Sequence, residues 1–152
     1  PEAITHSQLL LIGPASYHQQ TVESLMTETL PLIFKNENVS FDIVMNMQNH
    51  ACVNVILESQ SEISPFLPGK FPHCVMADKP IISLTPFNSE TRRLLGNDYP
   101  YWSEQTDETK IADILEQLYL LWKNDRTALT LNRPDLVTYL SPAYLKNVID
   151  TL

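Results

Sequence analysis

The chain has 152 residues, a formal net charge of −8, 43% hydrophobic residues and 18% charged residues. This length suits one domain with a single core, and the composition excludes a disordered chain. No apolar run approaches the roughly 18 residues that a membrane-spanning helix needs. Bulk attraction to nucleic acid usually needs a basic face, so the acidic balance argues against a nucleic-acid partner, whereas a small diphosphate needs only one or two local cations.

The first part of the chain alternates strands and helices. Ser7–Gly13 is continuously apolar and ends before a proline, which predicts a central parallel strand buried on both faces. Apolar residues recur at helical spacing over Thr21–Phe34, where Pro31 is expected to end or kink the helix. A further helix is expected over Ser40–Asn49, capped by its first residue. The apolar run Cys52–Leu57 predicts a second buried strand.

The second part continues this alternation. Ser141 and Pro142 match the preferred cap and first position of a helix, and Thr106 is placed to cap the longest one. Gly96 is expected to close a short helix, because glycine is the usual residue just after a helix end. The expected elements are a helix over Gly69–Ala77, a strand over Pro80–Leu84, a short helix over Ser89–Leu95, an edge strand over Tyr99–Trp102, and helices over Thr106–Lys123 and Pro142–Leu152.

This order of elements predicts an α/β fold, with a Rossmann-like three-layer α/β/α arrangement around a mostly parallel sheet. Residues 1–152 are expected to form one such domain. Ligands of these sheets bind beyond the carboxyl ends of the strands. The loops after Ile12, Leu57 and Leu84 would share that edge, so we expect the binding site there.

The cysteines and the start of the chain bear on location. Cys52 and Cys74 stand in apolar segments without the spacing of a metal or redox pair, which predicts reduced core residues in a cytoplasmic protein. We expect no metal ion and no bound cofactor. The chain begins at Pro1 without a methionine, which suggests a piece of a longer protein.

Residues 64–84 are the most informative segment, because a loop, a short helix and a buried strand follow one another. Gly69 permits a ligand to approach the backbone, and Lys70 adds a full charge to the positive end of the helix. These two residues favour a phosphate-bearing ligand. Ser64 is expected either to bind that phosphate or to bond within its own turn. Phe66 is expected either to pack on a base or to anchor the loop in the core.

Several segments together resemble one enzyme family. They are SQLLLIGP, VSFDIVMNMQNHACVNVILE, SPFLPGKFPHCVMADKPIISLTP, DETKIADILEQLYLLW and SPAYLKNVI. The pattern covers nearly the whole chain and resembles the carboxyl-terminal, donor-binding half of GT-B glycosyltransferases of the family 4 (group 1) kind, with SPFLPGKF and DKPII as its specific parts. The resemblance implies a domain that binds a nucleotide-sugar, such as a UDP-sugar, as a substrate of bacterial polysaccharide biosynthesis.

The resemblance also implies roles for single residues. The diphosphate would lie against Gly69 and Lys70, and Lys70 would stabilise the leaving diphosphate as charge develops on it. His73 would contact the ribose or base, or would be a structural histidine. Gly13, after the first strand, would meet phosphate or would form a plain turn.

Two acidic residues of the family are replaced in this chain. Their positions align with Pro65 and His73, and Glu58 and Glu62 are nearby acids to which no spacing rule assigns a role. Two alternatives therefore stay open. One is half of a nucleotide-sugar 2-epimerase, which shares the fold. The other is a non-catalytic α/β interaction or regulatory module whose ligand site has decayed, and the presence of Lys70 argues against it.

The family's acceptor-binding half is absent from this sequence. The implied partners are a nucleotide-sugar, bound by this chain, and a glycan or lipid-linked acceptor held by the amino-terminal half. Peripheral contact with the inner face of the membrane would come through the full-length protein. The isolated chain is expected to bind its donor weakly and to catalyse nothing.

Overall fold

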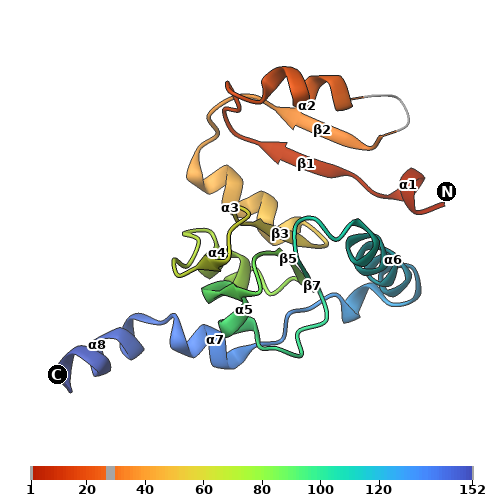
Figure 1. Cartoon of the computed structure of the whole chain (residues 1–152). Helices are drawn as coiled ribbons and strands as arrows, with labels where there is room; N and C mark the ends of the chain where they lie inside the picture. Colours follow the sequence, from red (N-terminus) through yellow and green to blue (C-terminus); the bar gives the residue numbers. More distant parts are fainter. Residues whose placement is uncertain (1, 27–29, 152) are drawn as a thin grey trace. The chain divides into compact units, whose positions relative to one another are not determined.

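The computed structural model describes residues 2–26 and 30–151. The chain is an α/β protein with parallel sheets (Figure 1), as the alternation of elements predicts. It divides into two compact units, residues 1–46 and 47–152, which we call the N-terminal and C-terminal units. A compact unit is not by itself an independently folding domain, so a single domain over the whole chain stays a prediction.

The N-terminal unit contains one pair of strands. β1 and β2 run parallel, in a register that sets Leu9 against Leu32 and Ile12 against Lys35. The backbone turns away after β1 at Gly13, whose φ of +130° is in the region that favours glycine. The elements are α1 (Glu2–His6), β1 (Leu9–Ile12), α2 (Gln19–Leu25), β2 (Leu32–Lys35) and the first part of α3 (Phe41–His50).

Two expectations for this unit are wrong. The helix predicted over Thr21–Phe34 stops early: its last part belongs to strand β2, and residues 27–29 lie outside the described residues. Pro31 has no N–H to continue a helix, and its carbonyl accepts a strand hydrogen bond from Leu9 N at 2.8 Å. β1 is not a buried central strand, because within the described residues it pairs only with β2 and its residues Leu9, Leu10 and Leu11 are exposed.

The C-terminal unit contains a three-stranded parallel sheet in the order β3-β5-β7. β5 (Ile81–Leu84) lies between β3 (Asn54–Leu57) and β7 (Trp102–Ser103). The predicted edge strand is therefore present, but it begins at the end of its predicted range. β3 also begins later than predicted, because residues 52 and 53 form a bend; Cys52 is exposed there and is not a core residue. A short parallel pair, β4 (Ile63–Ser64) and β6 (Asn88–Ser89), completes the strands described.

The helices of this unit begin and end largely at residues that the sequence marks. Gly96 closes α5 at φ +100°, as predicted. Ser89, predicted as the first residue of this helix, is its cap and accepts a hydrogen bond from Arg92 N at 3.1 Å. Ser141 caps α8 as predicted, by accepting from Tyr144 N at 3.1 Å. The helices are α4 (Phe71–Met76), α5 (Glu90–Leu95), α6 (Glu108–Asn124), the 3-10 helix η1 (Arg126–Ala128), α7 (Pro134–Tyr139) and α8 (Pro142–Asp150).

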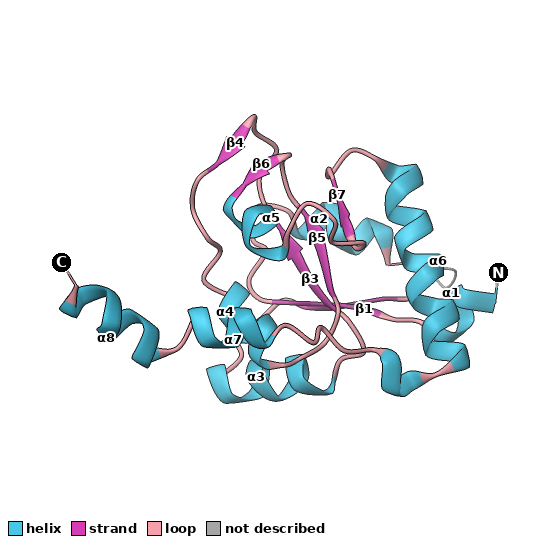
Figure 2. Ribbon diagram, turned by 90° about the horizontal axis from the view of Figure 1, so that it is seen from below, coloured by secondary structure: helices cyan, strands magenta, loops and turns pink. Residues whose placement is uncertain are grey.

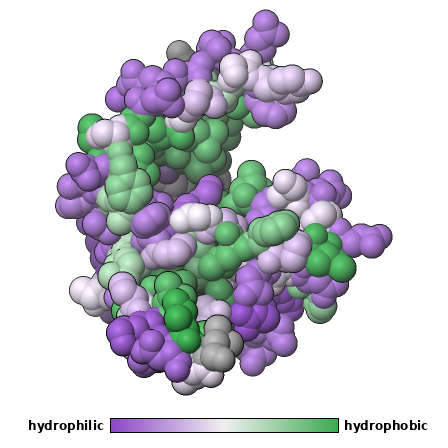
Figure 3. Space-filling model, turned by 90° about the vertical axis from the view of Figure 1, so that its left-hand side faces the viewer, coloured by the Kyte–Doolittle hydropathy of each residue, from purple (hydrophilic) through white to green (hydrophobic). Residues whose placement is uncertain are grey.

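One helix cap differs from the prediction, and the sequence did not predict α7 and η1 in this unit or α1 in the N-terminal unit. Asp107, not Thr106, caps α6, because its Oδ1 accepts from Lys110 N at 3.0 Å and its charge suits the positive helix end. α7 is only six residues long, too short for a clear apolar period. The apolar face of α8 is exposed along its length, and Figure 3 shows hydrophobic residues near that end of the chain.

Neighbouring residues of β5 bury their side chains on opposite faces of the sheet. Ile81 belongs to a core cluster with Phe71, Val75 and Leu94, while Ile82 belongs to another with Ile114 and Leu118. Figure 2 shows α6 on one side of β3 and β5 and α4 and α7 on the other. Because successive strand residues point to opposite faces, this continuously apolar strand needs cover on both sides. The C-terminal unit thus has the three layers of a Rossmann-like α/β/α fold.

Candidate functional site

The carboxyl ends of the three parallel strands lie at one edge of the sheet in the C-terminal unit. Glu58 follows β3, Thr85 follows β5 and Ser103 ends β7, and all three side chains are buried. Backbone hydrogen bonds join the three strand ends: Glu58 N donates to Leu84 O at 3.0 Å, and Thr85 N donates to Ser103 O at 3.1 Å. Parallel sheets bind ligands at this edge, so the buried polar groups here are candidates for a site.

The Thr85 hydroxyl connects the elements at this edge. It accepts hydrogen bonds from Ser89 Oγ at 3.1 Å and from Trp102 Nε1 at 3.0 Å. Ser89 is the cap of α5, and Trp102 is the first residue of β7. These bonds therefore hold the start of α5 and the indole ring against the end of β5.

The hydrogen bond between Thr91 and Glu58 leaves one oxygen of the buried Glu58 carboxylate without a partner among the described residues. Thr91 Oγ1, from α5, donates to Glu58 Oε1 at 2.5 Å. The other oxygen, Oε2, is buried and has no hydrogen-bond partner among the described residues. An unsatisfied buried acceptor costs about 1–3 kcal/mol, and more when it is charged. A ligand hydroxyl or N–H that reached Glu58 would relieve this cost.

Arg92 is the corresponding buried cation, and it lies on the same short helix. Only 9% of its surface is exposed, and Nη1 is buried without a hydrogen-bond partner among the described residues. Its Cζ lies 4.1 Å from the centre of the Phe87 ring and 3.6 Å from that of the Trp102 ring. Lys110 Nζ lies 4.2 Å from the Trp102 ring. Such cation–π contacts contribute roughly 0.5–2 kcal/mol each and hold the guanidinium without neutralising it.

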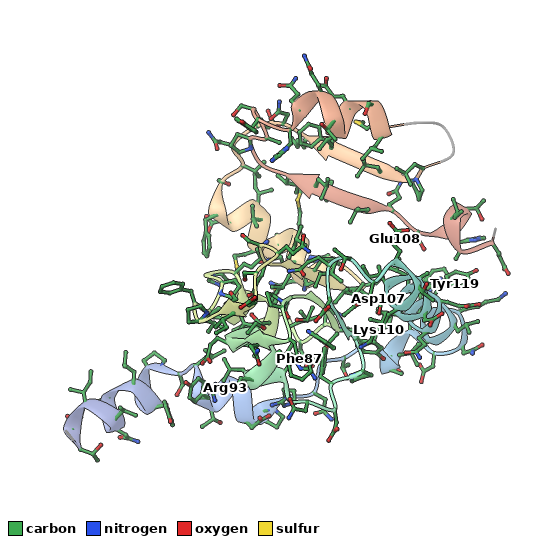
Figure 4. All side chains as sticks on the ribbon, viewed as in Figure 1. Phe87, Arg93, Asp107, Glu108, Lys110 and Tyr119 are labelled. Carbon is green, nitrogen blue, oxygen red and sulfur yellow. The ribbon has the colours of Figure 1, made fainter. Side chains whose placement is uncertain are left out.

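A surface pocket of about 370 Å³ opens beside these residues. Its walls include Ser64 and Pro65 from the β4 segment, Ser89 at the end of β6, and Arg92 from α5. Figure 4 labels two further wall residues, Phe87 and Arg93, beside α5. The pocket thus combines hydroxyl groups, an aromatic ring and a buried guanidinium, which together suit a polar, anionic small molecule.

Of the predicted site residues, Ser64 is the one that lines this pocket. Phe66 is 82% exposed, which rules out the prediction that it anchors the loop in the core. Lys70 is exposed immediately before α4, and His73 lies half-buried within that helix. α4 has six residues, so the partial charge at its first N–H groups is small and the full charge of Lys70 is its main electrostatic feature.

The two glycines of the predicted site differ from each other. Gly69 has an ordinary backbone conformation, and a Cβ atom at this position would have no other atom within 4 Å. The turn itself therefore does not require glycine there. Open space at Gly69 is compatible with close approach of a ligand. Gly13 lies in the N-terminal unit, after β1, while the other predicted site residues lie in the C-terminal unit.

Sequence reasoning missed Arg92 and Phe87, did not place Trp102 in the site, and offered Glu58 only as an acid that could substitute for a replaced one. No spacing rule connects these positions, because they meet only when β3, β5 and β7 pair and α5 packs on the sheet edge. One local signal was present. α5 buries Thr91, Leu94 and Leu95, so Arg92 stands beside the apolar face of its helix.

Other reactive groups do not extend the site. Burial raises the pKa of the Cys74 thiol to about 11, so the thiol stays protonated at neutral pH and is a core residue, as predicted. Within residues 2–26 and 30–151 we find no cluster of three or more histidine, cysteine or acidic side chains suited to a metal ion. In the same residues no helix has both the length and the apolar character needed to cross a membrane.

Comparison of the chain with protein-family models, with curated proteins and with solved structures gives no match.

Proposed function

We propose that the chain is the nucleotide-sugar-binding domain of a glycosyltransferase. It would hold an NDP-sugar, in the first instance a UDP-sugar, whose sugar passes to a polysaccharide or glycolipid acceptor. The observation that supports this proposal most is the pocket at the carboxyl edge of a parallel sheet, with the Ser64 hydroxyl and the Arg92 guanidinium in its walls. This is the position at which folds of this class bind nucleotides.

The charges of the chain support a role for a diphosphate. Lys70 is exposed, and among the described residues it forms no ion pair, so its ammonium is available to a ligand. In the proposed reaction Lys70 stabilises the negative charge that develops on the leaving diphosphate. A preorganised cation near the leaving group stabilises the transition state more than the ground state, because the charge grows as the bond to the sugar breaks.

The acceptor and the sugar transfer itself belong, in this proposal, to a longer protein. The amino-terminal half of the resembled family would hold the glycan or lipid-linked acceptor. The present chain alone should bind the donor and should not transfer the sugar. Assignment to the cytoplasm, at the inner face of the membrane, is part of the same proposal.

One observation favours a non-catalytic module instead. Pro65, which stands where the family has an acidic residue, lines the pocket, and its side chain has no hydrogen-bonding group. The other replaced position, His73, is not among the residues that line the pocket. A module of this kind would keep the fold and lose nucleotide binding.

The test is a titration of the chain with UDP, GDP and UDP-glucose, followed by NMR shifts of backbone amides and by calorimetry. We expect saturable binding that shifts Ser64, Gly69 and Lys70, and a loss of roughly tenfold or more in affinity, about 1.4 kcal/mol, for Lys70→Ala. Lys146→Ala is the matched control, because Lys146 is an exposed lysine on α8 paired with Asp150 at 2.8 Å. No binding of any nucleotide at millimolar concentration would favour the non-catalytic module.

A further inference from the structure

The pocket beside α5 contains two arginines in different electrostatic states. Arg93 is neutralised: its Nε donates to Glu90 Oε2 at 2.8 Å, and the pair holds the pKa of Glu90 below its usual range. Arg92, the next residue, forms no ion pair among the described residues. Both line the pocket, so Arg92 is the wall cation whose charge has no counter-ion.

Burial makes this arrangement costly for Arg92. A guanidinium is normally kept in water or paired with a carboxylate, because removing a charge from water without a partner is unfavourable. The Phe87 and Trp102 rings contact the group at 4.1 Å and 3.6 Å from their centres and meet each other edge to face at 6.0 Å. They restrict its orientation but accept no N–H hydrogen bond from Nη1. An apolar side chain of similar length would fill this position without the unpaired charge.

The residues around the Arg92 guanidinium are held in place by hydrogen bonds, which makes it a rigid binding group. Ser89 Oγ accepts from Arg92 N at 3.1 Å, and the Ser89 hydroxyl is in turn bonded to Thr85. Trp102 is fixed by its own bond to the same threonine at 3.0 Å. The backbone of Arg92 and one of the rings beside it are therefore both anchored to the end of β5. A cation held in one orientation loses little entropy when an anion binds.

We infer that the pocket lined by Ser64, Ser89 and Arg92 binds the oxyanion of a small molecule, a carboxylate or a phosphate, and that Arg92 is the residue that recognises it. Guanidinium groups bind both of these planar or tetrahedral oxyanions through charge-assisted hydrogen bonds. Lys70 is not among the residues that line this pocket. The inference does not depend on the proposed function. If the chain binds a nucleotide-sugar, the oxyanion is its diphosphate or the carboxylate of an acidic sugar.

The experiment titrates the ¹⁵N-labelled chain with sodium phosphate, pyrophosphate, acetate and glucuronate at constant ionic strength, with glucose as the neutral control. The readouts are the backbone amides of Ser64 and Ser89 and the side-chain Nε–H signal of Arg92. We expect saturable shifts with at least one oxyanion and none with glucose. Binding by glucuronate and acetate alone identifies a carboxylate site, and binding by phosphate and pyrophosphate alone identifies a phosphate site.

The variants are Arg92→Met, Arg92→Lys and the matched control Arg126→Met, because the Arg126 guanidinium also lies over an aromatic ring, that of Trp122, and does not line the pocket. We expect Arg92→Met to weaken oxyanion binding by roughly tenfold or more, and Arg126→Met to leave it within about twofold. Arg92→Lys keeps the charge but loses the fork of donors, so an intermediate affinity is expected. If Arg92→Met does not fold, the affinity of Arg92→Lys and the titration of the wild-type Arg92 Nε–H signal test whether Arg92 binds the oxyanion.

Two results overturn the inference. One is the absence of a saturable shift at Arg92 with any of the four oxyanions at up to tens of millimolar. The other is unchanged affinity in the Arg92 variants. Nucleotide binding that is unchanged in the Arg92 variants would contradict the inference and would still agree with the proposed function. Oxyanion binding without nucleotide binding would agree with the inference and would contradict the proposed function.

Discussion

Replacing Tyr99 with phenylalanine tests how the parallel sheet of the C-terminal unit is completed. On the β7 side of β5, Ser83 N donates to Tyr101 O at 2.9 Å. Two residues earlier, at Ile81, none of the described residues of β7 pairs with this side of β5. The Tyr99 hydroxyl takes that place: it accepts from Ile81 N at 2.9 Å and donates to Ile81 O at 3.0 Å. Ile81 is fully buried, so water cannot reach its backbone N–H and C=O groups to replace the hydrogen bonds to Tyr99.

The Tyr99→Phe change leaves two buried backbone groups without a partner. Each such group costs about 1–3 kcal/mol, so we expect a loss of roughly 2–6 kcal/mol in the free energy of unfolding, with the ring still packed on its core cluster. For a chain of this size that corresponds to a fall in Tm of about 4–24 °C. The measurement is urea and thermal unfolding at pH 7, followed by circular dichroism.

Tyr101→Phe is the matched control. Its ring meets Tyr99 edge to face at 5.7 Å, and within the described residues we find no hydrogen bond of its hydroxyl. This control should change the free energy of unfolding by less than about 0.5 kcal/mol, as surface hydroxyl changes usually do. An equally small loss for Tyr99→Phe, or an equal loss in both variants, would refute the view that the Tyr99 hydroxyl replaces a strand partner.

The same hydroxyl predicts a pH dependence. Burial raises the pKa of Tyr99 from 10.0 to about 12. Because the folded-state pKa is the higher one, the contribution to stability is complete below about pH 10 and is lost as the pH rises from 10 to 12. At 1.36 kcal/mol per pKa unit the loss is on the order of 2–3 kcal/mol. Urea unfolding at pH 9, 10 and 11 should show the gap between wild type and Tyr99→Phe narrowing across this range, and a constant gap would contradict the assignment.

Three further predictions concern helix ends and are checked by urea unfolding. Arg133 donates to the last carbonyls of α5, so Arg133→Met should cost about 1–3 kcal/mol, whereas Arg93→Met, which breaks an exposed ion pair, should cost less than about 1 kcal/mol; equal losses would contradict this reasoning. Gly96→Ala should cost about 1–3 kcal/mol because φ +100° is strained for alanine, while Gly69→Ala should be neutral or stabilising by up to about 1 kcal/mol; a harmless Gly96→Ala would count against this conformation. Ser141→Ala should cost about 1 kcal/mol and speed hydrogen exchange at the first amides of α8, and unchanged exchange would argue against this cap.

The elements that local sequence determined are those whose signals lie within a few residues. The closing glycine of α5, the Ser141 cap of α8 and the buried strand β5 were predicted because helix-end signals act within a few residues and a strand shows its apolar run directly. The α/β class followed from the order of such elements. Ser64, which the sequence predicted as a phosphate ligand or a turn residue, lines the pocket.

Tertiary structure alone decided the features that depend on contacts between distant residues. The segment around Leu32–Lys35 has helical spacing, yet it is a strand because it pairs with β1, more than twenty residues earlier along the chain. Glu58 meets Thr91 across 33 positions, and Arg92 meets Trp102 only where β7 joins the sheet. No periodicity or spacing encodes these meetings, because they follow from which strands pair and which helix packs on their ends. The buried, unpaired charges of the candidate site are therefore a property of the fold and not of any local motif.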